Sequence, residues 1–496
     1  MALNGIVLVL GVTVRVTEYV NFDAVGLAEL VAAGEVTPAE LVAAAREAAQ
    51  AVDPRINAVV ETWPTDDEPE PGSAPLAGVP FLIKDIGVAM AGRRTELGSR
   101  LAAGLVAGAD SALMRRLRRA GLVTFGRTAT PELAYSITTE PVLYGPTRNP
   151  WDPTRSAGGS SGGAGAAVAA GVVPLAHATD AAGSLRIPAA YNGLFGLKPT
   201  RGRVSVAPDA DEIFNGLGVQ GSVSRTVRDS AALLDLIGGP EPGDPYYAPR
   251  PERPYAEEVT RPPGPQRIGV LTQAWGGRRT TAPVADAVSR TVRLLESLGH
   301  RVVAAEVDLG VDWEEFVLAN ARLMTANLTA SVDGLAAALG RTVDSSTLEP
   351  VTLAAYRYGQ RVGADRFVAA LAVRNRVARS LARCFEAHDV LLTPTVPEPP
   401  VLLGAYGEGA EELDGLGWID RLNDRSPFTM AFNVAGTPAM SVPVTADAGT
   451  GLPIGMQFAA AYGEEGRLFR LAGQLEQASP WSGRTPTVWA GGPTGH

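Results

Sequence analysis

Three short segments of the sequence carry residues that could do chemistry. Residues 156–165 read SAGGSSGGAG and hold two adjacent serines among glycines, residues 179–186 read TDAAGSLR, and the apolar run LAGVPFLIK ends in Lys84. A serine hydroxyl becomes an effective nucleophile only when a neighbouring base takes its proton. A lysine can be that base where burial keeps its amine uncharged. The three segments are therefore candidates for nucleophilic catalysis without a histidine.

The glycine-rich segment has other interpretations. The run GGSSG at residues 158–162 matches the GxSxG pattern of a nucleophile elbow, but an elbow follows a strand, and an irregular proline-containing stretch precedes this run. A phosphate-binding loop needs GxxxxGK[ST] and a dinucleotide-binding loop needs GxGxxG after a strand, and neither pattern is present. Glycines that let a helix pack closely are a third, structural interpretation. It accounts for part of the segment but not for the two adjacent serines.

The histidines and the single cysteine disfavour other kinds of hydrolase. His177, His300, His388 and His496 show no metal-ligand spacing, and no HExxH motif is present, so no metal is expected. Cys384 alone can form neither an internal disulfide nor a CxxC site, which favours the reducing cytoplasm as location. Both His177 and Cys384 are predicted to be core residues.

Composition limits the class of partner. The chain has 496 residues, 46% of them apolar, which indicates a globular protein. Its net charge of −10 argues against nucleic acid or an anionic membrane as partner. The apolar run near the N-terminus is too short to span a bilayer and lacks the basic start of a secretory signal. A small molecule is the expected partner.

The elements that must position the three segments alternate between strand and helix. LAGVPFLIKD and LVTFGRT are predicted strands, and the amphipathic SALMRRLRRA between them is a predicted helix. After the glycine-rich loop we expect a small-residue helix at AGAAVAAG, a buried strand at VVPLA, a tight loop at ATDAAGS and a helix that begins near Arg186. Later strands are RIGVLTQ, RVVAAEV, HDVLLTPTV and the closing pair AGTPAMSVPV and GLPIGMQFAA, followed by a last helix, EGRLFRLAGQLEQA. The alternation predicts an α/β fold.

Residues 23–490 are predicted to form one domain. It begins with helical residues that include a capping box at Thr37-Pro38-Ala39-Glu40. Residues 312–388 are mostly helical and are predicted to be an insertion that faces the substrate. Residues 1–22 are an N-terminal extension, either an added strand or the result of a start codon placed too early.

The segment SAGGSSGGAGAAVAAGVVPLAHATDAAGSLRIPAAYNGLFGLKPT resembles the signature segment of the amidase signature family. The spacing of Ser160 and Ser184 is similar to that family's, and so are GVPFLIKD, TRNPWDPTRSAGG, FNVAGTPAMSVP and GLPIGMQF. The likeness extends over about residues 23–480. It implies a central mixed β-sheet with helices on both faces, hydrolysis of amide C–N bonds without a cofactor, and a homodimer.

Carried over position by position, the resemblance implies a catalytic triad. Ser184 would be the nucleophile, Lys84 the base, and Ser160 a bridging serine held by a cis peptide bond. A bridging hydroxyl can accept a proton on one side and donate one on the other. This implied arrangement is a Ser-Lys variant of the triad principle.

The resemblance also implies an oxyanion hole made of consecutive backbone N–H groups, those of Ala181, Ala182, Gly183 and Ser184. The family usually has glycine where this chain has Ala182. Because alanine adds a Cβ, Ala182 could narrow the hole, slow the chemistry or bias the choice of substrate.

Other residues are expected to support the site. Ser161 is predicted to position the neighbouring loops by hydrogen bonds, and Asp180 and Arg186 to fix the loop around Ser184. Tyr135 and the helical residues 312–388 are predicted to line the substrate pocket.

The substrate is the least determined part of the prediction. RTATPELAYSITTEP and VVPLAHATD most resemble the branch of the family that opens 6-aminohexanoate cyclic dimers. We therefore expect cyclic or linear 6-aminohexanoate oligomers or similar small amides. Two alternatives stay open: a glutamine-amidotransferase subunit that supplies ammonia to a partner protein, and a binding-only relative, which the intact Lys84, Ser160 and Ser184 disfavour.

Overall fold

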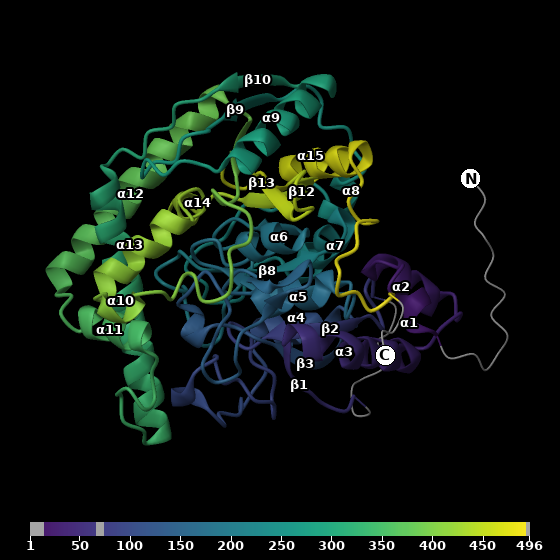
Figure 1. Ribbon diagram of the computed structural model, residues 1–496, viewed down its shortest axis with the longest axis horizontal. Helices are drawn as coiled ribbons and strands as arrows, with labels where there is room; N and C mark the ends of the chain where they lie inside the picture. The colour runs from purple at the N-terminus through teal and green to yellow at the C-terminus, as the bar shows by residue number, and fades with distance from the viewer. Residues whose placement is uncertain (1–13, 66–73, 493–496) are drawn as a thin grey trace.

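The computed structural model describes residues 14–65 and 74–492 (Figure 1). Within these residues eleven strands form one sheet in the order β1-β3-β2-β6-β8-β7-β12-β13-β11-β9-β10, and β4 and β5 form a separate pair. Strand β2 is parallel to β3 and β6, and β9 is parallel to β10 and β11, whereas the other neighbours are antiparallel. The sheet is therefore mixed, as expected.

The strands are β1 (Val59–Thr62), β2 (Pro80–Lys84), β3 (Val123–Thr128), β4 (Arg148–Asn149), β5 (Asp152–Ser156), β6 (Leu175–Asp180), β7 (Phe195–Lys198), β8 (Val219–Ser224), β9 (Arg267–Val270), β10 (Arg301–Ala304), β11 (Val390–Pro394), β12 (Ala439–Ala446) and β13 (Pro453–Ala459). The α-helices are α1 (Val16–Tyr19), α2 (Ala24–Ala32), α3 (Pro38–Ile56), α4 (Ala112–Arg119), α5 (Gly162–Ala169), α6 (Arg186–Asn192), α7 (Val227–Ile237), α8 (Tyr255–Glu258), α9 (Ala282–Ser297), α10 (Trp313–Leu339), α11 (Pro350–Gly359), α12 (Ala364–Ala387), α13 (Gly415–Arg425), α14 (Met430–Ala435) and α15 (Glu465–Ala478). Short 3₁₀ turns are η1 (Arg100–Ala102), η2 (Glu132–Ala134) and η3 (Ala410–Glu412).

Helices cover the sheet on both faces. Around β12 and β13, Figure 1 shows α9 and α15 on one side and α6 on the other. Helix α3 begins with the local signal that the sequence predicts. At α3 the Thr37 hydroxyl accepts from the Glu40 N–H at 3.2 Å, and the Glu40 carboxylate accepts from the Thr37 N–H at 2.8 Å. This reciprocal pair is a capping box, so the prediction there is confirmed.

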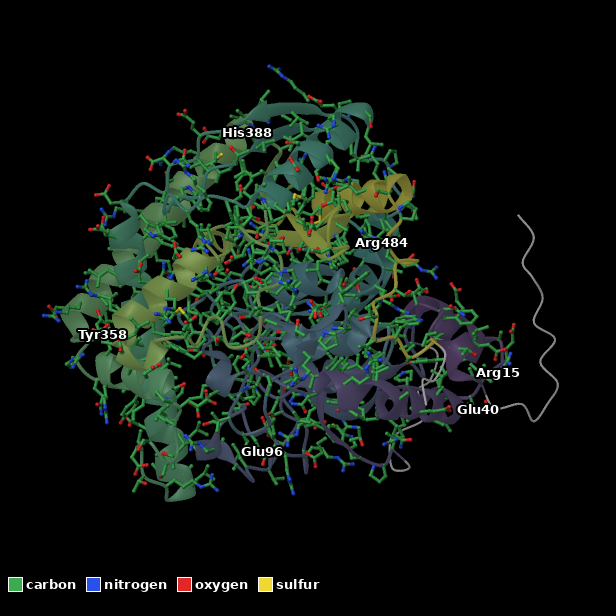
Figure 2. All side chains as sticks on the ribbon, in the orientation of Figure 1. Arg15, Glu40, Glu96, Tyr358, His388 and Arg484 are labelled. Carbon is green, nitrogen blue, oxygen red and sulfur yellow. The ribbon has the colours of Figure 1, made fainter. Side chains whose placement is uncertain are left out.

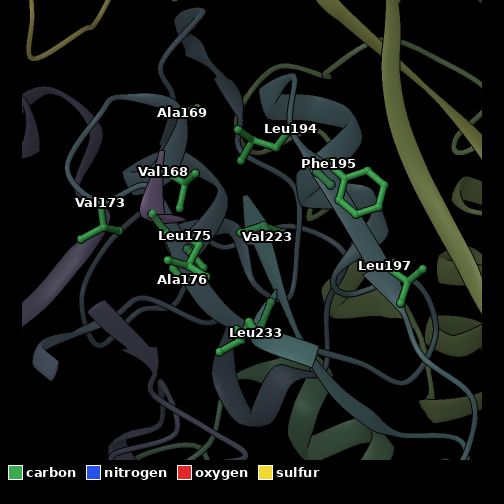
Figure 3. Packing of buried hydrophobic residues seen from close by; sticks show 14 of the residues in the cluster. Val168, Ala169, Val173, Leu175, Ala176, Leu194, Phe195, Leu197, Val223 and Leu233 are labelled. Carbon is green, nitrogen blue, oxygen red and sulfur yellow. The ribbon is translucent and has the colours of Figure 1, made fainter. Parts of the chain in front are cut away.

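The small-residue helix α5 is buried along its whole length and packs against the central strands. Figure 3 shows Val168 of this helix beside Leu175 of β6, in the cluster that also holds Val223 of β8. A Cβ built on Gly163 would lie 2.4 Å from the Ala129 backbone N, closer than real Cβ atoms come. The structural interpretation of the glycines is therefore correct for this helix.

One predicted strand is displaced. The sequence predicts a strand at VVPLA, residues 172–176, and a loop at ATDAAGS, but the strand β6 begins at Leu175 and continues to Asp180. The Val172 N–H donates to the Ala167 carbonyl at the end of α5, so it closes the helix and does not enter the sheet. Antiparallel pairing with β8 extends β6 at its other end, where Asp180 is paired with Val219.

A layer of long helices stands beside the sheet. Helices α10, α11, α12 and α13 pack on one another around a second hydrophobic cluster. In Figure 2, Tyr358 on α11 lies at the outer edge of this layer, and His388, just after α12, lies near its upper end. Within residues 14–65 and 74–492, none of the helices has the length and apolarity needed to cross a membrane.

The N-terminal extension is described only in part. The alternatives for residues 1–22, an added strand or a start codon placed too early, fall largely on residues 1–13, which lie outside the described residues. From Val16 to Tyr19 the chain is helical, and the Tyr19 hydroxyl donates to the Val172 carbonyl at 3.0 Å.

Candidate active site

Lys84 is the last residue of β2 and is fully buried. Its Nζ lies 2.7 Å from Ser160 Oγ, 2.9 Å from Ser161 Oγ and 2.8 Å from Thr179 Oγ1. Because β2 and β6 are parallel, Lys84 and Thr179 reach the same edge of the sheet. Ser160 and Ser161 come immediately before α5. The fold thus brings the lysine and the adjacent serines of the glycine-rich segment together.

Lys84 is surrounded by hydroxyls, and none of the ion pairs formed by the described residues includes it. Burial lowers the pKa of Lys84 to about 7, although the negative charge of Asp180 acts in the opposite direction. The adjacent carboxylate, Asp85, is paired instead with Arg127 Nη1 at 2.5 Å, and both side chains are buried. Asp85 also accepts from the Glu96 and Gly98 N–H groups. A surface ion pair between Lys84 and Asp85 is therefore excluded.

The hydrogen bonds around Lys84 can be assigned when its amine is neutral. A neutral amine has two N–H donors and one lone pair, which matches its three hydroxyl neighbours. Ser161 Oγ already accepts from the Thr179 N–H at 3.2 Å, and its own hydrogen can donate to the Thr179 carbonyl at 3.3 Å. Lys84 can therefore donate to Ser161 and Thr179 and accept from the Ser160 hydroxyl, which leaves the Ser160 oxygen able to accept another proton.

His177 lies beside Lys84 but is a core residue. Its Nδ1 accepts from the Lys84 backbone N–H at 3.2 Å, so Nε2 carries the hydrogen and donates to Gln220 Oε1 at 2.8 Å. Burial lowers the pKa of His177 to about 4, which keeps the ring neutral. The prediction of a packed core histidine is confirmed.

Ser184 lies between β6 and α6 and is 7% exposed. It lines the same cavity as Ser160, and its carbonyl accepts from the Ser161 N–H at 3.1 Å. The peptide bond between Gly159 and Ser160 is cis. The structure therefore places Ser160 and Ser184 in the wall of one cavity.

The loop that carries Ser184 is tied down by Asp180 and Arg186. The Arg186 guanidinium donates to both carboxylate oxygens of Asp180, at 2.8 and 2.9 Å, and both side chains are fully buried. Burial raises the pKa of Asp180, but the charge of Arg186 outweighs this and lowers it to about 2. Arg186 also donates to the Thr429 carbonyl and to Asn433 Oδ1. The ion pair thus links the loop to the start of α14.

The same carboxylate changes the expected oxyanion hole. The Gly183 N–H donates to Asp180 Oδ1 at 2.7 Å, so it is already used inside the loop. The predicted set of four donors is therefore reduced to the N–H groups of Ala181, Ala182 and Ser184. Thr429 fixes this peptide chain from the other side, since its hydroxyl donates to the Ala182 carbonyl at 2.6 Å.

Thr179 and Thr429 were not predicted as site residues. Thr179 falls in a segment that the sequence pattern assigns to a loop, and only its place on β6 turns its hydroxyl toward Lys84. Thr429 is remote in sequence, and no motif around it indicates a contact with Ala182. It is therefore a residue that only the three-dimensional fold could identify.

We expect Gly183→Ala to be strongly damaging. Gly183 has φ of +124°, and an added Cβ would lie 2.6 Å from Thr429 Oγ1 and 2.9 Å from Ile187 Cδ1. The loop must shift to admit the methyl group, and a misplaced nucleophile or oxyanion donor commonly costs on the order of 10²-fold in rate. Steady-state kcat/KM measures the effect, with Gly92→Ala as control, because Gly92 also has positive φ but has nothing within 4 Å of an added Cβ. Equal, small effects of both substitutions would contradict the expectation.

The cavity in front of Ser184 has a largely apolar wall. Apolar side chains come from separate elements, among them Ile137, Phe214, Met324 and Leu422. Tyr135 also lines it, with its ring edge-on to Phe214 at a centroid distance of 6.5 Å. Of the described residues that line the wall, only Asp180 has a charged side chain, and Arg186 neutralises it. The cavity therefore suits an uncharged, mostly apolar molecule.

Comparison with known proteins identifies the class of this fold and site. A family model described as Amidase matches residues 40–469, so the chain belongs to the amidase family. It is 39% identical over 482 residues to a 6-aminohexanoate-cyclic-dimer hydrolase of Paenarthrobacter ureafaciens, and the match covers 94% of this chain and 96% of the relative. The protein is accordingly a hydrolase of amide C–N bonds, as the sequence predicted.

Solved structures agree with this assignment. The structure of a 6-aminohexanoate cyclic dimer hydrolase complexed with substrate matches with a TM-score of 0.88 and 37% identity, and covers 95% of this chain and 99% of that one. A glutamyl-tRNA(Gln) amidotransferase component from Thermotoga maritima matches with a TM-score of 0.73 and 26% identity, and covers 96% of this chain and 98% of that one. The predicted α/β amidase signature fold is confirmed.

Proposed function

We propose that this enzyme cleaves carboxamide C–N bonds through a covalent acyl-enzyme on Ser184. Lys84 is the base, and Ser160 passes the proton between them. The observation that carries the proposal is the uncharged environment of Lys84, whose Nζ lies 2.7 Å from Ser160 Oγ while Asp85 is held by Arg127. Because the pKa of Lys84 is about 7, a large fraction of the amine is neutral near pH 7, and this neutral form can take a proton from a hydroxyl without first losing one.

The reaction follows from these positions. Ser184 Oγ attacks the substrate carbonyl carbon while its proton moves to Ser160 Oγ and the Ser160 proton moves to Lys84 Nζ. The negative charge that develops on the carbonyl oxygen is stabilised by the N–H groups of Ala181, Ala182 and Ser184. When the tetrahedral intermediate collapses, the C–N bond breaks and the proton returns by the same route to the leaving nitrogen. The products of this half-reaction are an amine and an ester on Ser184.

The second half-reaction regenerates the enzyme. Water attacks the ester carbonyl and loses its proton through Ser160 to Lys84. Collapse of the second tetrahedral intermediate returns that proton to Ser184 Oγ and releases a carboxylic acid. Ser161 and Thr179 keep the Lys84 amine in place during both steps, because they are its remaining hydrogen-bond partners.

We propose a small, uncharged amide as substrate, and the 6-aminohexanoate cyclic dimer as the best candidate. Support comes from the largely apolar cavity wall, in which the charged residue Asp180 is already paired with Arg186. A linear 6-aminohexanoate oligomer carries an ammonium and a carboxylate, and burying either charge without a partner is costly. The cyclic dimer has no ionised end. The named function of the relative from Paenarthrobacter ureafaciens agrees with this choice.

A substrate panel tests the proposal. We expect the purified chain alone to hydrolyse the cyclic dimer with a kcat/KM at least about tenfold above that for the linear dimer, because only the linear compound must bury charged ends. Glutamine, with two charges close to its amide, should be a poor substrate. Product formation by liquid chromatography and mass spectrometry is the measurement.

The same panel decides between this proposal and the amidotransferase alternative. If release of ammonia from glutamine is the fastest reaction, the result favours a protein that supplies ammonia to a partner. The similarity to the Thermotoga maritima protein makes this role the competing candidate. Hydrolysis of the cyclic dimer with little release of ammonia supports the proposed function.

A further inference from the structure

The wall of the reaction cavity contains two polar atoms that the mechanism does not use. Among the described residues, Tyr135 Oη and Asn423 Oδ1 are buried without a hydrogen-bond partner, and both side chains belong to this wall. Leaving such an atom unpaired costs folding free energy, so native proteins keep few of them and often keep them for a function.

The orientation of the Asn423 side chain follows from its helix. Ile419, Leu422 and Asn423 lie on the face of α13 that lines the cavity. The Asn423 Nδ2 donates to the Ile419 carbonyl at 2.8 Å. Exchange of the amide nitrogen and oxygen would place two carbonyl oxygens together, so Oδ1 must be the atom that points away from the helix backbone. Asn423 therefore presents a hydrogen-bond acceptor.

Tyr135 presents the complementary donor. Its carbonyl accepts from Trp418 Nε1 at 2.9 Å, which ties its backbone to α13, the helix that bears Asn423. Burial raises the pKa of the Tyr135 phenol well above its ordinary value, so the hydroxyl keeps its hydrogen. The unpaired donor of Tyr135 and the unpaired acceptor of Asn423, in a largely apolar wall, match the C=O and N–H of a secondary amide.

We propose that Asn423 and Tyr135 form a position for a second amide group of the substrate, separate from the amide that Ser184 attacks. Asn423 Oδ1 accepts from the N–H of that second amide, and the Tyr135 hydroxyl donates to its carbonyl. This inference rests on the proposed amide hydrolysis and narrows the substrate class to molecules with two amides. An analogue that leaves a buried polar pair without hydrogen bonds loses more affinity than an analogue that only fits an apolar wall less well.

The decisive comparison uses the cyclic dimer and its derivative with one amide nitrogen methylated, cleaved at the unmethylated amide. The wild-type enzyme should prefer the unmodified dimer by roughly 10–100-fold in kcat/KM, because methylation removes the N–H group from which Asn423 Oδ1 accepts a hydrogen bond. Asn423→Leu should lower kcat/KM for the dimer and leave the methylated compound nearly unchanged, so that the preference disappears. Asn320→Leu is the matched control, since Asn320 is also buried and bonded to a carbonyl four residues earlier, at 2.9 Å, but does not line the cavity.

Tyr135→Phe provides a second test that changes only a hydroxyl. It should lower kcat/KM for the cyclic dimer by roughly tenfold, mainly through KM, and leave N-hexylhexanamide, which has a single amide, unaffected. This variant keeps the ring against Phe214, so the wall retains its shape.

The possible results separate this inference from the function on which it rests. Equal hydrolysis of the dimer and its methylated derivative by the wild-type enzyme would overturn the second amide position and leave amide hydrolysis intact. A preference that survives in Asn423→Leu would also overturn it. Failure of the wild-type enzyme to hydrolyse any of the three amides would overturn the proposed function itself.

Discussion

Ser184→Ala should reduce hydrolysis of the cyclic dimer by roughly 10⁴–10⁶-fold, the range seen when a nucleophile is removed from a catalytic unit that acts together. The variant cannot form the ester, and the remaining groups bind the carbonyl without attacking it. The fold should persist, because Ser184 contributes its carbonyl, which accepts from the Ser161 N–H and does not depend on the side chain.

Two measurements check this expectation. Initial rates give kcat/KM, and mass spectrometry shows whether a fluorophosphonate adds to Ser184 in the wild-type enzyme and fails to add in the variant. Ser136→Ala is the control, because Ser136 is another serine in the cavity wall but lies outside the cluster around Lys84. Labelling at another serine, or a loss no larger than that of the control, would show that Ser184 is not the nucleophile.

Lys84→Met is expected to lower kcat/KM by roughly 10²–10⁴-fold, the usual contribution of a general base. Methionine fills a similar volume and is uncharged, so the buried site should not collapse.

The wild-type rate should also depend on pH. Because the pKa of Lys84 is about 7, the amine is protonated below that pH and has no lone pair for the Ser160 proton. kcat/KM should therefore fall as the pH drops below about 7 and level off above it.

A second lysine makes the assignment of that pH limb testable. The pKa of Lys198 is also lowered to about 7, chiefly by burial and then by Arg186. Its Nζ donates to the Pro199 carbonyl, and it does not line the cavity. Lys198→Met should keep the limb, whereas Lys84→Met should remove it from the residual activity. The reverse pattern would exclude Lys84 as the base.

Much of the site could be predicted because its parts are local in sequence. The apolar run before Lys84 indicates a buried strand, and the adjacent serines amid glycines demand an explanation that packing alone does not give. The resemblance to a family then supplies roles for residues that lie far apart in the chain. In the structure Lys84 is buried and close to Ser160, which agrees with what those patterns indicated.

The parts that could not be predicted depend on contacts between distant segments. Asp180 was expected to hold the loop, but its bond to the Gly183 N–H, which removes a donor from the oxyanion hole, depends on how the loop turns. The Thr429 hydroxyl reaches the Ala182 carbonyl only because the chain at the start of α14 packs beside this loop. Likewise the sequence places strand β6 too early, because its length is set by pairing with β8 and not by its own apolar run.

Asp85, which follows Lys84 in the sequence, is neutralised by a buried partner of its own. Arg127 is bound by Asp85, Glu96 and Glu61, and its Nη1 also donates to the Tyr144 hydroxyl at 3.2 Å. Any substitution that draws Arg127 away would leave the buried Asp85 carboxylate without its charged partner, and burial would then favour the protonated form of Asp85. The charge balance at the end of β2 that carries Lys84 therefore depends on an arginine of the neighbouring strand β3, which lies outside the wall of the reaction cavity.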